Sequence, residues 1–170
     1  MTKGTAGART GAHMKGQLVL RRATAADVAD IAELVNEYAA AEIMLPRTAA
    51  QVALAIDDYV VATDGHGRLL ACGALREYSP SLAELVSLAV ARVAHGRGLG
   101  RHIVAQVERL AVQRGFTSVF AHTLNPSFFE AVGYREVPRD LYPEKRARPH
   151  TACFERSLTQ APAERWAEAA

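Results

Sequence analysis

A glycine-rich segment at residues 95 to 100, with the sequence HGRGLG, constrains the fold of this chain more than any other feature. Residues 82 to 90 before it read as a strand, and the apolar spacing of residues 99 to 111 after it predicts a helix. Such a unit turns main-chain N–H groups toward one point and adds the unpaired donors and the positive dipole end of the helix. It therefore predicts an anion site, to which Arg97 and Arg101 add positive charge.

The glycine spacing disfavours two common nucleotide sites. No Gly-Lys-Ser or Gly-Lys-Thr follows, as it would in a Walker loop, and the GxGxxG pattern of dinucleotide-binding folds is absent. Nucleotide hydrolysis and hydride transfer therefore lose support. A glycine cluster before a helix also occurs as a tight connection without any ligand, and that interpretation stays open at this point.

Size and composition bound the class of protein. The chain has 170 residues, of which 49% are hydrophobic and 22% charged, as is typical of one well-buried domain. A formal net charge of +2 gives no excess that would favour nucleic acid or an anionic membrane as partner. We find no apolar run of the roughly 18 residues that a membrane span needs and no secretory signal. Two cysteines, without a CxxC or HxxxH cluster, predict no disulfide scaffold and no metal site, so we expect a cytoplasmic protein with reduced thiols.

The pattern along the chain predicts three regions. Residues 1 to 16 resemble a disordered or tag-like segment, residues 17 to 158 form the domain, and residues 159 to 170 form a tail. Within the domain we expect strands over 17–22, 59–63, 68–75, 82–90, 117–123 and 151–158, and helices after Thr24, after Thr48 (with Val52, Leu54 and Ile56 as its apolar content), from 99 to Gly115 and over 126–132. This alternation predicts an α/β or α+β fold with a mixed sheet.

Residues 82 to 90 alternate in a way that bears on function. Regular pleating places Leu82, Glu84, Val86, Leu88 and Val90 on one face of the strand, and Ala83, Leu85, Ser87 and Ala89 on the other. One carboxylate, that of Glu84, therefore lies in an otherwise apolar row.

The glycine segment resembles the acetyl-CoA loop of the GNAT superfamily of N-acyltransferases. That pattern is Gln or Arg, two residues, Gly, one residue, and Gly or Ala, directly after a strand; Gly98 and Gly100 match it, and His95 replaces the usual first residue. The resemblance extends from about Val19 to Leu158 and implies a sheet splayed at the cofactor strand, flanked by helices, with acetyl-CoA as cosubstrate.

The resemblance also assigns residues to acetyl-CoA. The edge of the splayed strand would pair with the pantetheine arm, and the loop would hold the diphosphate. The residues so assigned are Leu88, Ala89, Val90, His95, Gly96, Arg97, Gly98, Leu99, Gly100, Arg101, Asn125 and Phe129. Many relatives carry a tyrosine that protonates the departing thiolate at the position of Phe129, which has no proton to donate. Tyr134 follows Gly133 where relatives carry a buried aromatic residue.

Direct transfer to an amine asks for a proton acceptor and an oxyanion donor. Glu84 is our candidate base, acting directly or through water, although a carboxylate simply paired with an arginine would look the same in sequence. Ser87 is a secondary candidate, because a bulge of the kind expected in this superfamily would turn it toward Glu84. His122 reads as structural. We expect neither cysteine to lie beside a plausible histidine partner, so no acyl-enzyme is expected.

Narrower features resemble the short stand-alone bacterial glutamate N-acetyltransferases of arginine biosynthesis. These are the segments at 45–48 (LPRT), 72–75 (CGAL), 83–85 (AEL) and 143–145 (PEK), the last ahead of Cys153. The resemblance implies the α-amine of glutamate as acceptor, and leaves open whether the protein is a homodimer. Arg47, Arg76 and Arg156 are the candidate partners of an amino acid carboxylate, with Lys145, Arg146 and Arg148 as a nearby basic run.

Two alternatives remain at this point. The chain could acetylate another amine, such as glutamine, a polyamine, an antibiotic or a protein N-terminus. It could also be an acyl-CoA-binding module without catalytic activity, because Phe129 replaces the usual acid.

Overall fold

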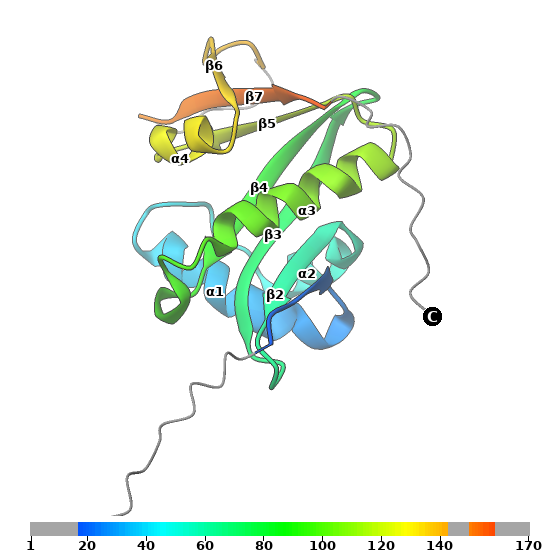
Figure 1. Cartoon of the computed structure of the whole chain (residues 1–170), viewed down its shortest axis with the longest axis vertical. Helices are drawn as coiled ribbons and strands as arrows, with labels where there is room; N and C mark the ends of the chain where they lie inside the picture. Colours follow the sequence, from blue (N-terminus) through cyan, green and yellow to red (C-terminus); the bar gives the residue numbers. More distant parts are fainter. Residues whose placement is uncertain (1–16, 143–149, 159–170) are drawn as a thin grey trace, which may run out of the picture.

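Seven strands form one mixed sheet in the computed structural model, which describes residues 17–142 and 150–158 (Figure 1). The strands are β1 (Val19–Arg22), β2 (Tyr59–Thr63), β3 (Leu69–Ser79), β4 (Leu82–Val90), β5 (Ser118–Thr123), β6 (Arg135–Val137) and β7 (Ala152–Ser157). Their order is β1-β2-β3-β4-β5-β7-β6, and β4–β5 is the parallel pair among otherwise antiparallel neighbours. The expected mixed sheet is confirmed. The expected end segments, 1 to 16 and 159 to 170, lie outside the described residues.

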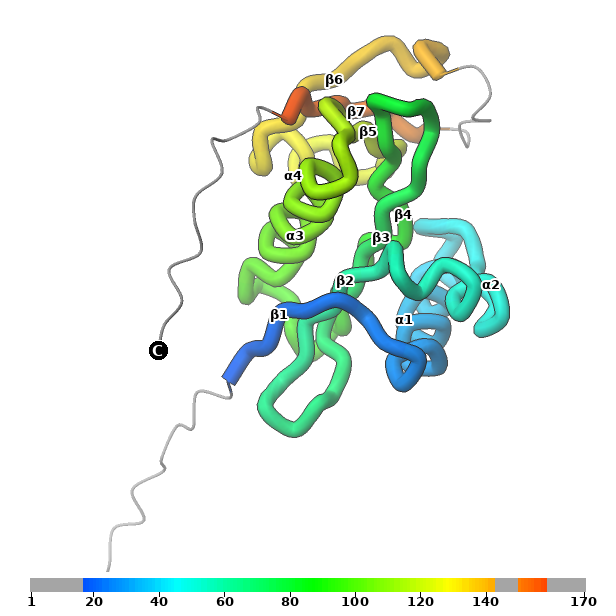
Figure 2. The backbone as a smooth tube through the Cα atoms, turned by 90° about the vertical axis from the view of Figure 1, so that its right-hand side faces the viewer, coloured from blue at the N-terminus to red at the C-terminus, as the bar shows by residue number. Residues whose placement is uncertain are grey.

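Helices cover both faces of the sheet. They are α1 (Val28–Ala40), α2 (Ala49–Leu54), α3 (Leu99–Gln113) and α4 (Pro126–Ala131), with short 3-10 turns η1 (Ala25–Asp27), η2 (Ile56–Asp58) and η3 (Arg92–Ala94). Figure 2 shows α3 and α4 on one side of β3 and β4, and α1 and α2 on the other. Within the described part of the chain, no helix combines the length and apolarity that crossing a membrane requires.

The predicted apolar stripe of α3 is confirmed and packs on the sheet. Ile103 and Val107 have no exposed surface, and Leu99 and Leu110 are almost fully buried. Gly73 of β3 permits this close approach, because a Cβ at that position would lie 2.5 Å from a methyl carbon of Ile103. The small residue therefore fixes how near α3, and the glycine loop before it, lie to the sheet.

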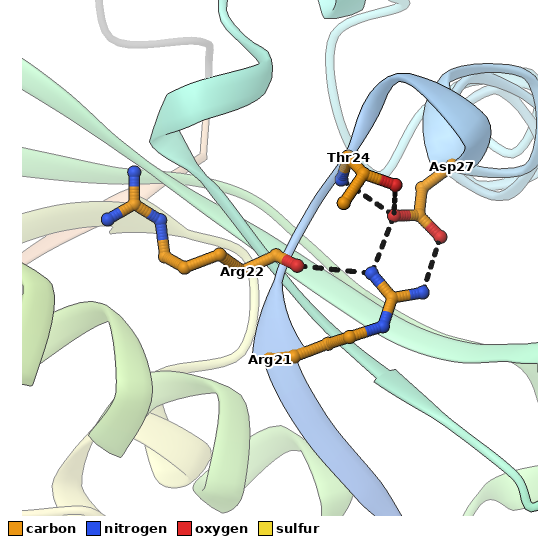
Figure 3. Close-up of polar contacts among 4 residues, drawn as sticks. All are labelled: Arg21, Arg22, Thr24 and Asp27. Carbon is orange, nitrogen blue, oxygen red and sulfur yellow. Dashed lines mark hydrogen bonds and ion pairs between the residues drawn. The ribbon is translucent and has the colours of Figure 1, made fainter.

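The helix expected after Thr24 is confirmed; it begins with a capping box that an arginine reinforces (Figure 3). The Thr24 main-chain N–H donates to Asp27 Oδ2 at 2.7 Å, and the Arg21 guanidinium donates to Oδ2 at 2.7 Å and to Oδ1 at 2.8 Å. These bonds to Arg21 and Thr24 outweigh burial and lower the pKa of Asp27 to about 2. The Thr24 hydroxyl also donates to Oδ2, at 3.1 Å. The entry into α1 is thus held by a buried carboxylate that accepts four hydrogen bonds.

Thr48 begins α2 as expected, through reciprocal bonds with Gln51. Its apolar content was predicted incorrectly in part. Val52 is fully buried, whereas Leu54 is 91% exposed, because α2 is a helix of only 6 residues that presents one side to the core. The edge strand β6 was not predicted, since three residues are too few to show alternation.

A bulge in β4 overturns the face assignment made from alternation. Between Val86 and Ala89, β4 contains one residue more than the β3 segment that it pairs with, and Ser87 there has φ +56°. The extra residue reverses the pleat. Leu88 and Val90 therefore pack with the cluster under α3, opposite to the face of Val86. The bulge itself was expected from the family resemblance.

Candidate active site

The parallel strands β4 and β5 separate at Glu84. Their pairing consists of Leu82 with Ser118, Ala83 with Val119 and Glu84 with Phe120. Beyond that rung β4 continues to Val90 beside β3, while β5 continues beside β7, and Figure 1 shows the two strands diverging. The β4 main chain beyond Glu84 thus forms an edge that can pair with an extended ligand.

The glycine loop lies at the end of this edge. Gly96 and Gly98 both have φ +73°, a left-handed conformation that favours glycine, and Gly98 is the N-cap of α3. Among the described residues, the main-chain N–H groups of 96 to 101 have no main-chain acceptor. The side chains of Arg97 and Arg101 are exposed beside them. Free donors, a helix N-terminus and two guanidinium groups together favour an anion such as a diphosphate.

His95 does not point along the loop but back to the strand end. Its Nε2 lies 3.0 Å from the Val90 carbonyl oxygen and 2.9 Å from the Tyr38 hydroxyl, and that hydroxyl donates to the same carbonyl at 2.5 Å. Burial raises the pKa of Tyr38. These contacts tie α1 to the loop. His95, which stands where the family pattern has Gln or Arg, therefore makes a structural contact. Tyr38 was not predicted, because it lies 57 residues from His95.

The late segment contributes a different aromatic ring from the expected one. Phe129 is 5% exposed and packs edge-on against Tyr134 in the core. Tyr134 is itself buried, as expected. Phe128 instead borders the loop, since a Cβ on Gly100 would lie 3.1 Å from its ring. Asn125 caps α4, where its Oδ1 accepts from the Phe128 main-chain N–H at 3.4 Å.

Glu84 is buried at the point where the strands separate, where it pairs with Arg76 and lies near His122. Its Oε2 accepts from Arg76 Nη2 at 2.7 Å and from Nε at 3.3 Å, while Oε1 lies 3.8 Å from His122 Nδ1. Arg76 itself is exposed. The structure therefore brings the expected base together with one expected substrate-binding arginine and with a histidine that the sequence indicated as structural.

Ser87 and Arg47 meet on this same face through Tyr59. The Tyr59 hydroxyl donates to Ser87 Oγ at 3.3 Å. Burial raises the pKa of Tyr59, while the Ser87 hydrogen bond and the Arg47 charge oppose this. Asn36 of α1 fixes the Arg47 main chain with two hydrogen bonds, of 2.8 and 3.0 Å. Neither Tyr59 nor Asn36 was predicted, because each looks like a core or surface residue in sequence.

Arg156 lies on the opposite face of the sheet from Glu84. Its Nη1 donates to the Val132 carbonyl at 2.8 Å and to Glu108 of α3 at 3.2 Å. Burial raises the pKa of Glu108. The expectation that Arg156 reaches the acceptor side is therefore not met, because its strand position points it under α3. Lys145, Arg146 and Arg148 lie outside the described residues.

Cys153 corrects the sequence-based view of the cysteines. It lies directly across from His122 in the β5–β7 register, so one cysteine does have a neighbouring histidine. Both thiols are nevertheless poor nucleophiles. Burial raises the pKa of Cys72 to about 12 and, together with Glu155 and Glu84, that of Cys153 to about 11. Across the described ranges, no three metal-ligating side chains gather.

Comparison with known proteins agrees with this geometry. Residues 28–134 match the acetyltransferase (GNAT) family. The chain belongs to that family. Its match spans α1, the diverging strands, the glycine loop and α3, which are the elements that build the candidate site. This GNAT protein is an acetyl-CoA-dependent N-acyltransferase.

Individual relatives of the GNAT protein include two curated enzymes. An uncharacterized N-acetyltransferase of Chlorobaculum tepidum is 36% identical over 81% of this chain and 88% of its own length. An amino-acid acetyltransferase of Mycobacterium tuberculosis is 32% identical over 70% of this chain and 69% of its own length.

Among solved structures, the N-acetylglutamate synthase of Neisseria gonorrhoeae, complexed with coenzyme A and N-acetyl-glutamate, superposes with a TM-score of 0.77. It is 23% identical and covers 86% of this chain and 36% of its own. At this identity the likeness shows the shared GNAT fold.

Proposed function

We propose that this GNAT protein transfers the acetyl group of acetyl-CoA directly to the α-amine of L-glutamate, the reaction that opens arginine biosynthesis. The observation that carries the proposal is the position of Glu84, a buried carboxylate at the rung where β4 and β5 separate. Guanidinium groups of Arg76 and Arg47 lie on the same face. The amino-acid acetyltransferase of M. tuberculosis and the N-acetylglutamate synthase of N. gonorrhoeae support an amino acid acceptor.

In this proposal the chain binds acetyl-CoA along the β4 edge. Main-chain groups of residues 88 to 90 pair with the pantetheine arm, and the N–H groups of 96 to 101 hold the diphosphate with Arg97 and Arg101. Phe128 borders the loop, while Asn125 and Phe129 act indirectly by holding α4. Acetyl-CoA supplies a thioester whose carbonyl carbon is open to attack by a neutral amine.

The acceptor's ammonium group then lies near Glu84. Its proton must leave before attack, and a carboxylate at the mouth of the opening favours that loss. Ser87, turned to this face by the bulge, presents its hydroxyl beside Tyr59 and toward the same region. A main-chain N–H near Val90 donates to the oxyanion.

Recognition of glutamate needs positive charge, because an unpaired buried carboxylate is costly and arginine can pair with it in two places. Arg47 is the first candidate, since its guanidinium is not occupied by a carboxylate among the described residues. Arg76 holds Glu84 and remains exposed, which lets it contact a second carboxylate. A cationic acceptor such as a polyamine meets an unfavourable charge here.

The experiment is a thiol-release assay with acetyl-CoA and a panel of glutamate, glutamine, spermidine and a peptide with a free N-terminus. We expect release with glutamate above all. Glu84→Gln should lower kcat/KM at least about 100-fold while coenzyme A affinity persists, and Glu77→Gln, an exposed carboxylate on the opposite face of β3, serves as control.

Three outcomes count against the proposal. Turnover of another amine with glutamate inert overturns the substrate. If coenzyme A binds but no amine leads to thiol release, the chain is a binding module. The pairing of Glu84 with Arg76 and the burial of Phe129 would then be structural features of that module. Full activity of Glu84→Gln removes the carboxylate from the mechanism.

A further inference from the structure

We propose that His122 takes the ammonium proton and that Glu84 acts through it, as the carboxylate that orients and stabilises the imidazole. This inference rests on the proposed function, because it assigns the proton acceptor of the same transfer. His122 would be the catalytic base, and Glu84 a positioning residue.

The position of His122 in the sheet gives the first argument. The β4–β5 pairing ends at the rung between Glu84 and Phe120, and His122 lies two residues further along β5. Side chains two apart on a strand share a face, so His122 lies on the face of Phe120 and Glu84. It is therefore the first residue of β5 on that face after the strands separate, next to the opening that an extended ligand would fill.

The environment of the imidazole gives the second argument. Nδ1 lies 3.8 Å from Glu84 Oε1, while Arg76 occupies the other carboxylate oxygen at 2.7 Å. Hydrogen bonds of catalytic groups are commonly longer before substrate is bound. The carboxylate favours the tautomer with its proton on Nδ1, which leaves a lone pair on Nε2.

The Nε2 atom is buried and has no hydrogen-bond partner among the described residues. A buried polar atom left unpaired costs about 1 to 3 kcal/mol, so native structures rarely retain one without use. A histidine with a carboxylate beside one ring nitrogen and no partner on the other is placed to act as a base.

Several titratable and charged groups face His122 and bear on the pH dependence of the proposed step. Facing it on the same side of the sheet are Glu84 (β4), Arg76 and Tyr78 (β3), Cys153 and Glu155 (β7), and Tyr142. The pKa of Cys153 is raised to about 11, and burial and the hydrogen bond to Glu155 raise the pKa of Tyr142. A thiol and a phenol whose pKa values are raised stay neutral near pH 7, so neither Cys153 nor Tyr142 competes for the ammonium proton.

The step balances without another reagent. The ammonium group gives one proton to His122 Nε2, and Glu84 stabilises the resulting imidazolium. The nitrogen–carbon bond forms as the carbon–sulfur bond breaks, and a second proton passes from nitrogen to the thiolate sulfur. His122 returns its proton to water, so the products are the amide, the thiol and one proton in solution.

The test compares pH profiles of kcat/KM for wild type, His122→Asn and Glu84→Gln, with His66→Asn in the exposed β2–β3 turn as control. Wild type should lose activity on the acid side in a single step, as expected when one base must be unprotonated. His122→Asn should lose about 100-fold or more at pH 7, lack that limb, and recover partly with added imidazole. Glu84→Gln should keep the limb but shift it to lower pH, because the imidazolium has lost its carboxylate. His66→Asn should match wild type.

Coenzyme A affinity and the thermal midpoint check that the variants fold, and His122→Gln repeats the test with a different side chain. Activity of both His122 variants within about threefold of wild type, or an acid limb that persists in them, overturns the assignment of His122 while the proposed function stands. If wild-type protein acetylates no amine at all, the proposed function fails, and the role of His122 fails with it.

Discussion

Replacing Asp27 by Asn should destabilise the protein by an amount that depends on pH in a defined way. The pKa of this carboxyl is lowered from 3.8 to about 2, chiefly by the bond from Arg21, with the Thr24 hydrogen bonds adding to it against burial. A group whose pKa is lower in the folded state adds stability above its unfolded pKa and loses it as pH falls through the folded pKa. The difference corresponds to about 2 kcal/mol at pH 7 and at pH 4, and to about 1 kcal/mol at pH 3.

Urea unfolding of wild type and Asp27→Asn at pH 7, 4 and 3 measures this directly. The gap in the free energy of unfolding should be about 2 kcal/mol at pH 7 and roughly halve by pH 3, because the protonated aspartic acid then resembles asparagine. Asp30→Asn, one turn further along α1 and exposed, is the matched control and should show little gap. A gap that stays constant from pH 7 to pH 3 would refute the reasoning, since it would then arise from packing and not from the ion pair.

Two glycine substitutions test how the loop is built. Gly98→Ala and Gly67→Ala both place a side chain at positive φ, +73° and +83° respectively, and should lower stability by a similar amount of about 1 kcal/mol. Only Gly98→Ala should weaken coenzyme A binding, by about tenfold in calorimetry. Equal coenzyme A affinities of the two variants would contradict the loop assignment. Gly73→Ala should lower the free energy of unfolding by about 1 to 3 kcal/mol, because its Cβ would lie 2.5 Å from Ile103. An unchanged denaturation midpoint would show that α3 is not held at this distance.

The sequence predicted the parts of the site that depend on local pattern. The strand, the glycine loop and the stripe of α3 follow from periodicity and from glycine spacing, and Thr24 and Thr48 were found because caps are local. Glu84 stood out as a carboxylate in an apolar row, and the structure buries it.

The rest depends on contacts between distant segments. The bulge at Ser87 reverses the faces of Leu88 and Val90, and a period of two cannot show an inserted residue. Arg156 looked like a ligand for a carboxylate, but the register of β7 turns it toward Glu108.

His122 was predicted to be structural because its contact with Glu84 also joins distant segments. Its pairing with Glu84 joins residues 38 apart on two strands that meet in parallel, and such contacts leave no local pattern.

A crystal structure with coenzyme A would test the central claim most directly. We expect diphosphate oxygens about 2.7 to 3.2 Å from the main-chain nitrogens of residues 96 to 101, with the pantetheine arm along β4 beyond Glu84. Coenzyme A bound elsewhere, with those nitrogens facing only solvent or protein, would contradict the account.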